Sequence, residues 1–178
     1  MSDTGTSESI RKSPFWRFSV KFYAVPGVAP ACIELQDQAG VDVNVLFFLL
    51  WNATQNRALN DSEVADLDRM IGAWRDMAVV PIRNVRRALK TPPPVLAAEA
   101  AEDSRTRIKA VELEAERLQQ EALYDLAQSG RFGRPAAGRE QAAHASVEAY
   151  QALLGHFPPK ALDAVLSAFA RFETPASP

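Results

Sequence analysis

Four basic side chains between residues 83 and 90 form the clearest group that could bind a ligand. They are Arg83, Arg86, Arg87 and Lys90. Successive spacings of three, one and three residues place them within about one third of a helix circumference. Such a face could hold the phosphates of a nucleic acid or an anionic lipid, weakly and in a salt-dependent way. Cations near a helix end also complement the helix dipole, so the group could equally be a solvated surface.

A second group of polar side chains follows Gly40. Asp42 and Asn44 could line a small polar pocket that faces two tryptophans. The residues of this candidate pocket are Asp42, Asn44, Trp51 and Trp74. In the alternative interpretation Asp42 caps the following helix and Asn44 bonds to backbone at a tight turn. Capping alone explains Asp42, which favours that alternative.

Motifs for catalysis and for cofactors are missing from the sequence. It contains neither G-x-S-x-G nor a glycine-rich phosphate loop, and Cys32 lies far from both histidines. Glu140 and His144 stand four apart once, whereas a di-iron bundle needs paired motifs. Catalytic residues therefore stay unknown, we expect no metal and no cofactor, and the balance is against an enzyme.

The composition fits one globular domain. The 178 residues are 47% hydrophobic and carry a formal net charge of −2. The hydrophobic fraction is enough for a sizeable core. The slightly negative net charge argues against a protein whose whole surface binds nucleic acid. The single cysteine excludes an intrachain disulfide, and the first residues contain no apolar signal core. We therefore expect a cytoplasmic protein.

The least polar stretch runs from Val43 to Trp51, where Asn44 is the only polar residue. A helix of that length rises about 14 Å, whereas a membrane crossing needs about 20 apolar residues. Asp42 is a good N-cap, so we predict a helix from Asp42 to about Gln55. A helix that is apolar on all sides is a buried, central one. Asn44 must then find hydrogen-bond partners in the core.

Caps and turns divide the rest of the chain into further helices. Ser13 and Pro14 open the first, and Gly40 closes the second. A fourth begins at Asp61 or Ser62 and reaches Lys90, with a kink or break at Pro81. The predicted fold is an all-α helical bundle with one long helix and a C-terminal helical pair. Its parts are a disordered N-terminus (1–12), one helical domain (13–172) with a core (14–90), a long helix (95–128) and C-terminal helices (140–172), and a disordered tail (173–178).

The long helix carries a narrow apolar stripe at spacings of three and four residues. The stripe consists of Ile108, Val111, Ala115, Leu118 and Ala122. Exposed apolar rows of that length are rare on monomers. We therefore expect an interface with a protein partner or with a second copy of the chain. Burial of the stripe by the C-terminal helices is the competing interpretation.

The amino-acid sequence also resembles that of a known family. The stretch FWRFSVKFYAVPGVAPACIELQDQAGVDVNVLFFLLW, then Trp74, VVPIRNVRRALK and ELEAERLQQ, is similar to small all-helical proteobacterial proteins known only as a domain of unknown function. The resemblance covers about residues 15–120. It implies an all-helical, cytosolic, bacterial protein and no particular activity.

Three functional hypotheses follow. The leading one is a non-enzymatic protein-interaction or regulatory factor, because the stripe needs a partner. The first alternative is a ligand-binding helical protein or an enzyme with an apolar pocket near Trp51 and Trp74. The second is weak binding of phosphate or nucleic acid through Arg83, Arg86, Arg87 and Lys90.

Overall fold

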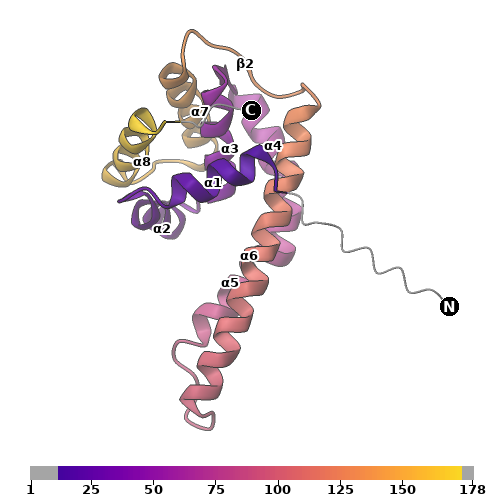
Figure 1. Ribbon diagram of the computed structural model, residues 1–178, viewed down its shortest axis with the longest axis vertical. Coiled ribbons are helices and arrows are strands. Elements are labelled where there is room, and N and C mark those ends of the chain that lie inside the picture. The colour runs from indigo at the N-terminus through magenta and orange to yellow at the C-terminus, as the bar shows by residue number, and fades with distance from the viewer. Residues whose placement is uncertain (1–11, 174–178) are drawn as a thin grey trace, which may run out of the picture.

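The fold is seen in a computed structural model that describes residues 12–173. It is almost entirely α-helical, which confirms the predicted all-α class (Figure 1). The elements are α1 (Pro14–Tyr23), α2 (Val28–Ala39), α3 (Val43–Thr54), β1 (Arg57–Ala58), α4 (Asp61–Trp74), the π-helical turn η1 (Arg75–Val79), α5 (Val80–Ala88), α6 (Ala98–Gln128), β2 (Arg134–Pro135), α7 (Arg139–Leu154) and α8 (Pro159–Arg171). Apart from Lys12 and Glu173, the predicted disordered ends lie outside the described residues.

The molecule consists of a rounded body and a projecting arm (Figure 1). The body gathers α1, α2, α3, α4, α7 and α8. Helix α5 and the first half of α6 form the arm, an antiparallel hairpin that runs away from the body. The short strands β1 and β2 pair antiparallel at the opposite end of the molecule. Helix α6 therefore belongs to both parts, with its first half in the arm and its second half against the body.

Helix α3 is the buried centre that the apolar run predicts. Every residue from Asn44 to Ala53 is buried, and α7, α6 and α1 pack around it. The carboxylate of Asp42 accepts the backbone N–H of Asn44 and of Val45, which confirms the predicted N-cap. Before it, Gly40 ends α2 with a φ of 66°, a left-handed conformation that favours glycine.

The N-cap of α4 differs from the prediction by one residue. Asn60, rather than Asp61 or Ser62, takes this position. Its side chain accepts the N–H of Glu63, and the Glu63 carboxylate accepts the N–H of Asn60. This reciprocal pair satisfies two N–H groups at the helix start, which a cap at either later residue would not do.

The α-helical register after α4 is broken before Pro81, as predicted. The N–H of Val80 donates to the carbonyl of Arg75, five residues earlier, which defines the π-helical turn η1. Proline has no N–H to continue an α-helical ladder, and a wider turn accommodates that loss. The chain nevertheless stays helical through α5, so η1 marks the base of the arm.

The body does not match the predicted core (14–90). Helix α5 has no buried residue, whereas α7 and α8 supply large core side chains. Those side chains include Tyr150, Val165 and Phe169, and Phe157 joins them from the connection between α7 and α8. Helix α7 packs on α3 and α4, and α8 packs on α2. The competing interpretation that the C-terminal helices bury the stripe is therefore wrong.

The long helix begins at Ala98 and not at Val95, because the three prolines at 92–94 hold the preceding chain in a turn. Within residues 12–173, none of the helices combines the length and the hydropathy that a membrane crossing requires.

Candidate functional site

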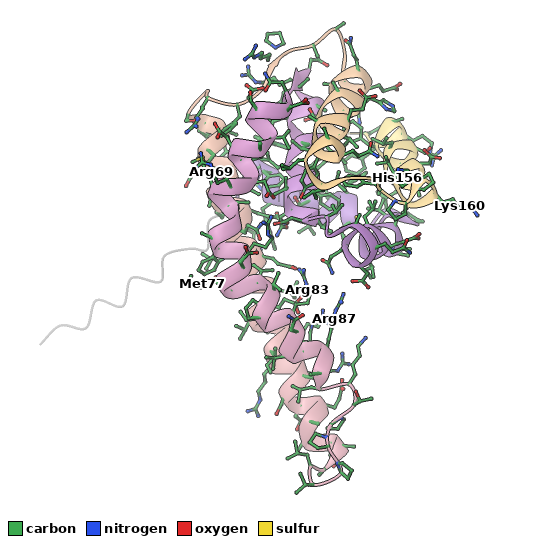
Figure 2. All side chains as sticks on the ribbon, turned by 180° about the vertical axis from the view of Figure 1, so that it is seen from behind. Arg69, Met77, Arg83, Arg87, His156 and Lys160 are labelled. Carbon is green, nitrogen blue, oxygen red and sulfur yellow. The ribbon has the colours of Figure 1, made fainter. Side chains whose placement is uncertain are left out.

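A groove of about 840 Å³ separates the arm from the body. Residues of α1, α2 and the start of α3 line one wall, and residues of α5 and α6 line the other. Arg83 and Arg87 lie on the side of the arm that faces the body (Figure 2). A cavity of this size is within the range of pockets that bind small molecules or short segments.

Both walls of the groove present apolar side chains to solvent. Val20 and Tyr23 come from α1, Ile33 from α2 and Leu113 from α6. Each is between 43 and 51% exposed, although each borders the same cavity. Phe47 of α3 lies buried behind them. Exposed apolar side chains that line one groove are a surface that a bound molecule could cover.

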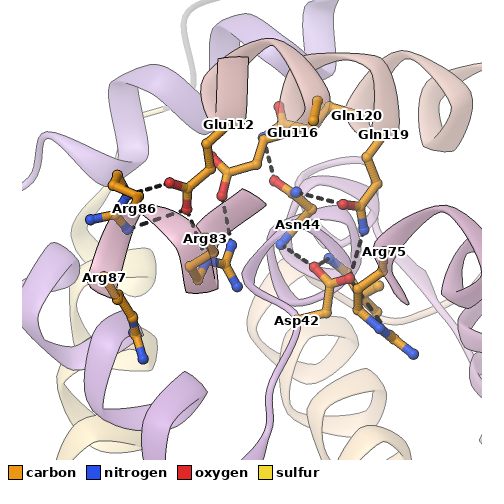
Figure 3. A network of polar contacts seen from close by, with 12 residues as sticks. Asp42, Asn44, Arg75, Arg83, Arg86, Arg87, Glu112, Glu116, Gln119 and Gln120 are labelled. Carbon is orange, nitrogen blue, oxygen red and sulfur yellow. Dashed lines mark hydrogen bonds and ion pairs between the residues drawn. The ribbon is translucent and has the colours of Figure 1, made fainter. Parts of the chain in front are cut away.

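Two arginines of the predicted basic face bind carboxylates of α6 (Figure 3). Arg83 donates from Nε to Glu112 at 3.0 Å and from Nη2 to Glu116 at 2.7 Å. Arg86 donates to both oxygens of Glu112. Glu112 is 5% exposed. These charge-assisted bonds fasten α5 to α6 and give the hairpin its register.

The pKa values of Glu112 and Glu116 are shifted in opposite directions. Burial alone would raise the pKa of Glu112, but hydrogen bonds from Arg86 and Arg83 outweigh it and hold that pKa below its ordinary value of 4.5. For Glu116 burial prevails over Arg83, and the pKa lies above 4.5. Glu116 therefore takes up a proton more readily than Glu112, although both carboxylates accept from Arg83.

The other two members of the basic face differ from each other. Arg87 donates to Asp37 of α2 at 2.7 Å, and this pair bridges the arm and the body. Lys90 lines the groove and has no ion pair among the described residues. Three of the four cations are thus committed to carboxylates of the same chain, which leaves less of the group for phosphate than its spacing predicts.

A chain of buried amides connects the groove to the start of α3 (Figure 3). Gln120 Nε2 donates to Asn44 Oδ1 at 2.6 Å, and Asn44 Nδ2 donates to Gln119 Oε1 at 3.0 Å. Gln119 Nε2 then donates to Asp42 Oδ2 at 2.6 Å. The chain confirms that Asn44 needs partners in the core. Burial, opposed by the hydrogen bonds and by Arg75, raises the pKa of Asp42.

Two buried polar atoms in the lining of the groove have no hydrogen-bond partner among the described residues. They are Ser19 Oγ and Gln120 Oε1. Ser19 is 3% exposed and Gln120 is 6% exposed. A buried polar atom without a partner costs free energy, so these two atoms are free acceptors for a water or for a bound molecule.

The two tryptophans of the predicted pocket take part in helix packing. Trp51 is buried against Phe15 and Tyr124, with ring centroids 5.6 and 5.7 Å away. Trp74 donates from Nε1 to the Ala115 carbonyl at 2.9 Å and attaches α4 to α6. Neither lines the groove, so the structure brings Asp42 and Asn44 to the groove and leaves both tryptophans elsewhere.

The apolar stripe lies on the side of α6 that faces away from the groove. Ala115 is buried and Ile108 is half-buried, while Val111, Leu118 and Ala122 are exposed. Leu113 lies on the groove flank because two helical residues turn the side chain by about 200°. Met77 of η1, 69% exposed, also points away from the groove (Figure 2). We call Met77, Val111 and Leu118 the outer flank.

Several groove residues that the sequence did not reveal lie on α6, beside others on α1 and α2. Those on α6 are Lys109, Glu112, Leu113, Glu116 and Gln120, and Gln119 belongs to the amide chain that joins the groove to the start of α3. A signal for part of this set exists in the segment ELEAERLQQ. Its Glu112 and Gln119 stand three residues before and four residues after Ala115, on the face that packs inward. Polar residues on such a face need buried partners, and Asn44 was already predicted to be a buried polar residue that needs a partner.

Other chemical groups do not form a site. Burial raises the pKa of the Cys32 thiol to about 12, so this thiol is not poised to react as a thiolate. Across residues 12–173, His, Cys, Asp and Glu side chains do not gather in a group that could hold a metal ion.

Comparison with known proteins places this arrangement in a family. A family model described as Protein of unknown function (DUF2390) matches residues 14–123, more than half of the chain. The match runs from the start of α1 into the last turns of α6, so it includes both walls of the groove. Neither a curated protein nor a solved structure matches the chain.

Proposed function

The chain belongs to the family described as Protein of unknown function (DUF2390), and we propose that it is a non-enzymatic interaction protein that binds a segment of a partner in the groove. One observation carries the proposal. The groove between arm and body combines exposed apolar side chains on both walls with buried polar atoms that have no partner among the described residues. A partner segment would cover the apolar side chains and supply hydrogen bonds to the buried polar atoms.

The charged groups of the groove support binding rather than catalysis. The Glu112 carboxylate accepts hydrogen bonds from two arginines, and Arg87 holds Asp37. These pairs give the walls a fixed shape and join the arm to the body. A fixed groove favours binding because less side-chain freedom is lost when a partner enters. A cytoplasmic location and a proteobacterial source stay predictions from the sequence.

Site-specific photocrosslinking tests the proposal. Leu113 would be replaced by p-benzoylphenylalanine, and the same replacement at Val111 would be the control on the outer flank. After irradiation in lysate of the source cells, we expect a protein adduct at position 113 that is missing at position 111. Mass spectrometry of the adduct should locate the crosslink in one short segment of the partner. Without an adduct specific to position 113, the proposal fails.

The outer flank supports a second candidate function, which is self-association. Val111 and Leu118 are 55 and 44% exposed and lie seven residues apart on one face of α6. Met77, on the neighbouring η1, is more exposed still. An antiparallel second copy would bring the same three side chains against this flank from the other side. The two candidates use opposite sides of α6, so they can be tested separately.

A further inference from the structure

The groove changes in chemical character along α6. Lys109, Leu113 and Gln120 all line it and follow one another on one side of the helix. From Lys109 to Gln120 the helix rises about 16 Å. A cation, an apolar side chain and an amide oxygen therefore stand at three successive heights of one wall.

The end of the groove toward the tip of the arm is cationic. Arg86 on α5 is level with Glu112 on α6, because the two are hydrogen-bonded. One turn further along each antiparallel helix lie Lys90 and Lys109. Neither lysine has an ion pair among the described residues, whereas the groove's carboxylates are bonded to arginines or to amides. The surplus positive charge of the groove is thus located on these two lysines.

The opposite end of the groove requires a hydrogen-bond donor. Gln120 Nε2 is used by Asn44, and the directed chain through Gln119 to Asp42 fixes the orientation of this amide. The remaining Gln120 Oε1 can only accept. Ser19 Oγ lies in the same lining and can accept or donate. A bound molecule that reaches this end would therefore pair best through an N–H or an O–H group.

We infer that the groove binds a short, extended peptide segment that is acidic at one end and apolar in the middle. The inference rests on the proposed function. The acid lies at Lys90 and Lys109, the apolar side chains lie against Val20, Ile33 and Leu113, and a backbone N–H or hydroxyl bonds to Gln120. A groove of this length holds about five extended residues. An extended backbone carries N–H donors along its length, which suits the amide end of the groove.

A peptide selection separates this inference from the proposed function. A random heptapeptide library displayed on phage would be selected on the full-length protein and depleted on the Leu113→Glu variant, whose fold would be checked by circular dichroism. We expect enriched peptides that combine apolar residues with Asp or Glu at one end. If no peptide depends on an intact groove, the proposed function fails. If groove-dependent peptides are basic or uncharged, the proposed function stands and the inference is overturned.

Fluorescence anisotropy with the best enriched peptide tests the cationic end. Reversing both charges with Lys90→Glu and Lys109→Glu should weaken binding about tenfold, since each ion pair becomes a repulsion. The matched control reverses Lys21 and Arg107, two exposed cations that do not line the groove. Equal weakening by the two double variants, or none by either, would remove the lysines from the site.

Ser19→Ala tests the polar end. The hydroxyl has no partner among the described residues, so its removal should leave the melting temperature of the free protein unchanged or slightly higher. Peptide binding should weaken several-fold, because one donor of the peptide then loses its acceptor. Unchanged affinity would place the bound segment away from this end and overturn the proposed orientation.

Discussion

The Asp42 carboxylate joins the start of α3 to two other helical elements. Its Oδ1 caps α3, while its Oδ2 accepts from Gln119 and lies 3.6 Å from Arg75 Nη1. We expect Asp42→Ala to lower the free energy of unfolding by about 1–3 kcal/mol, because the cap is lost and the buried Gln119 amide loses its acceptor. Asp42→Asn, which can keep the cap, should cost less. Urea denaturation of both variants measures this, and an alanine variant as stable as wild type would contradict it.

Glu112 gives the hairpin a pH dependence whose sign is fixed. Its pKa is below 4.5 in the folded protein and near 4.5 in the unfolded chain, so the unfolded chain binds a proton more readily. The Glu112 contribution to stability is therefore present above pH 4.5 and disappears as the pH falls through the folded pKa. We expect Glu112→Gln to be less stable at pH 7 and to lose less stability than wild type on acidification.

Thermal melting between pH 7 and pH 3 checks this prediction. Glu114→Gln is a suitable control, because the exposed Glu114 carboxylate pairs with Arg117 of the same helix and not with an arginine of α5. Neutralising Glu112 leaves Arg86 without a carboxylate and Arg83 with Glu116 alone, which should cost about 1–3 kcal/mol at pH 7. Parallel pH profiles for wild type and Glu112→Gln would show that the carboxylate does not act in this way.

Individual residues could be predicted where their role is local. Ser13 and Asp42 act as caps within a few residues of themselves, so their type and position were sufficient. Asn44 could be predicted to need a partner, since it interrupts an apolar run. The partners could not be predicted, because Gln119 and Gln120 are 75 and 76 residues away and only the packing of α6 on α3 brings them near.

At the scale of elements, the arm is the least predictable part. The amphipathic pattern of residues 61–90 is the same whether its apolar face packs in a core or on one other helix. In the structure α5 packs on one other helix, α6, and contributes no buried residue. The three prolines at 92–94 indicated where the hairpin turns, but not that the hairpin leaves the body.

The arm should be the less stable part of the helical structure. Along the first half of α6 only Ala101 is fully buried before Glu112, whereas α3 is buried over ten consecutive residues. Backbone hydrogen bonds with few buried apolar contacts around them open locally at low cost. Hydrogen exchange followed by mass spectrometry should show faster exchange in residues 80–108 than in α3. Equal protection of both segments would contradict this assignment.

At the scale of the whole molecule, one helix serves two surfaces. Helix α6 turns Leu113 toward the groove and Val111 and Leu118 toward the outer flank. The sequence pointed to the second surface through its regular stripe. It could not reveal the first, because the walls come from α1, α2, α5 and α6 and only the packing of these helices brings their residues together. A partner segment in the groove and a second copy on the outer flank could bind at the same time.

Self-association through the outer flank makes a specific prediction. Changing Val111 and Leu118 together to Glu places two charges in the middle of the exposed apolar face. If that face is the interface, the wild type should sediment as a dimer at tens of micromolar and the double variant as a folded monomer, because a buried unpaired charge opposes association. Leu113→Glu is the matched control, since it adds a charge to the same helix on the groove flank. It should leave the dimer intact and abolish peptide binding. A wild type that is monomeric at these concentrations would rule out a self-association site here, and the groove would then be the remaining binding surface of the arm.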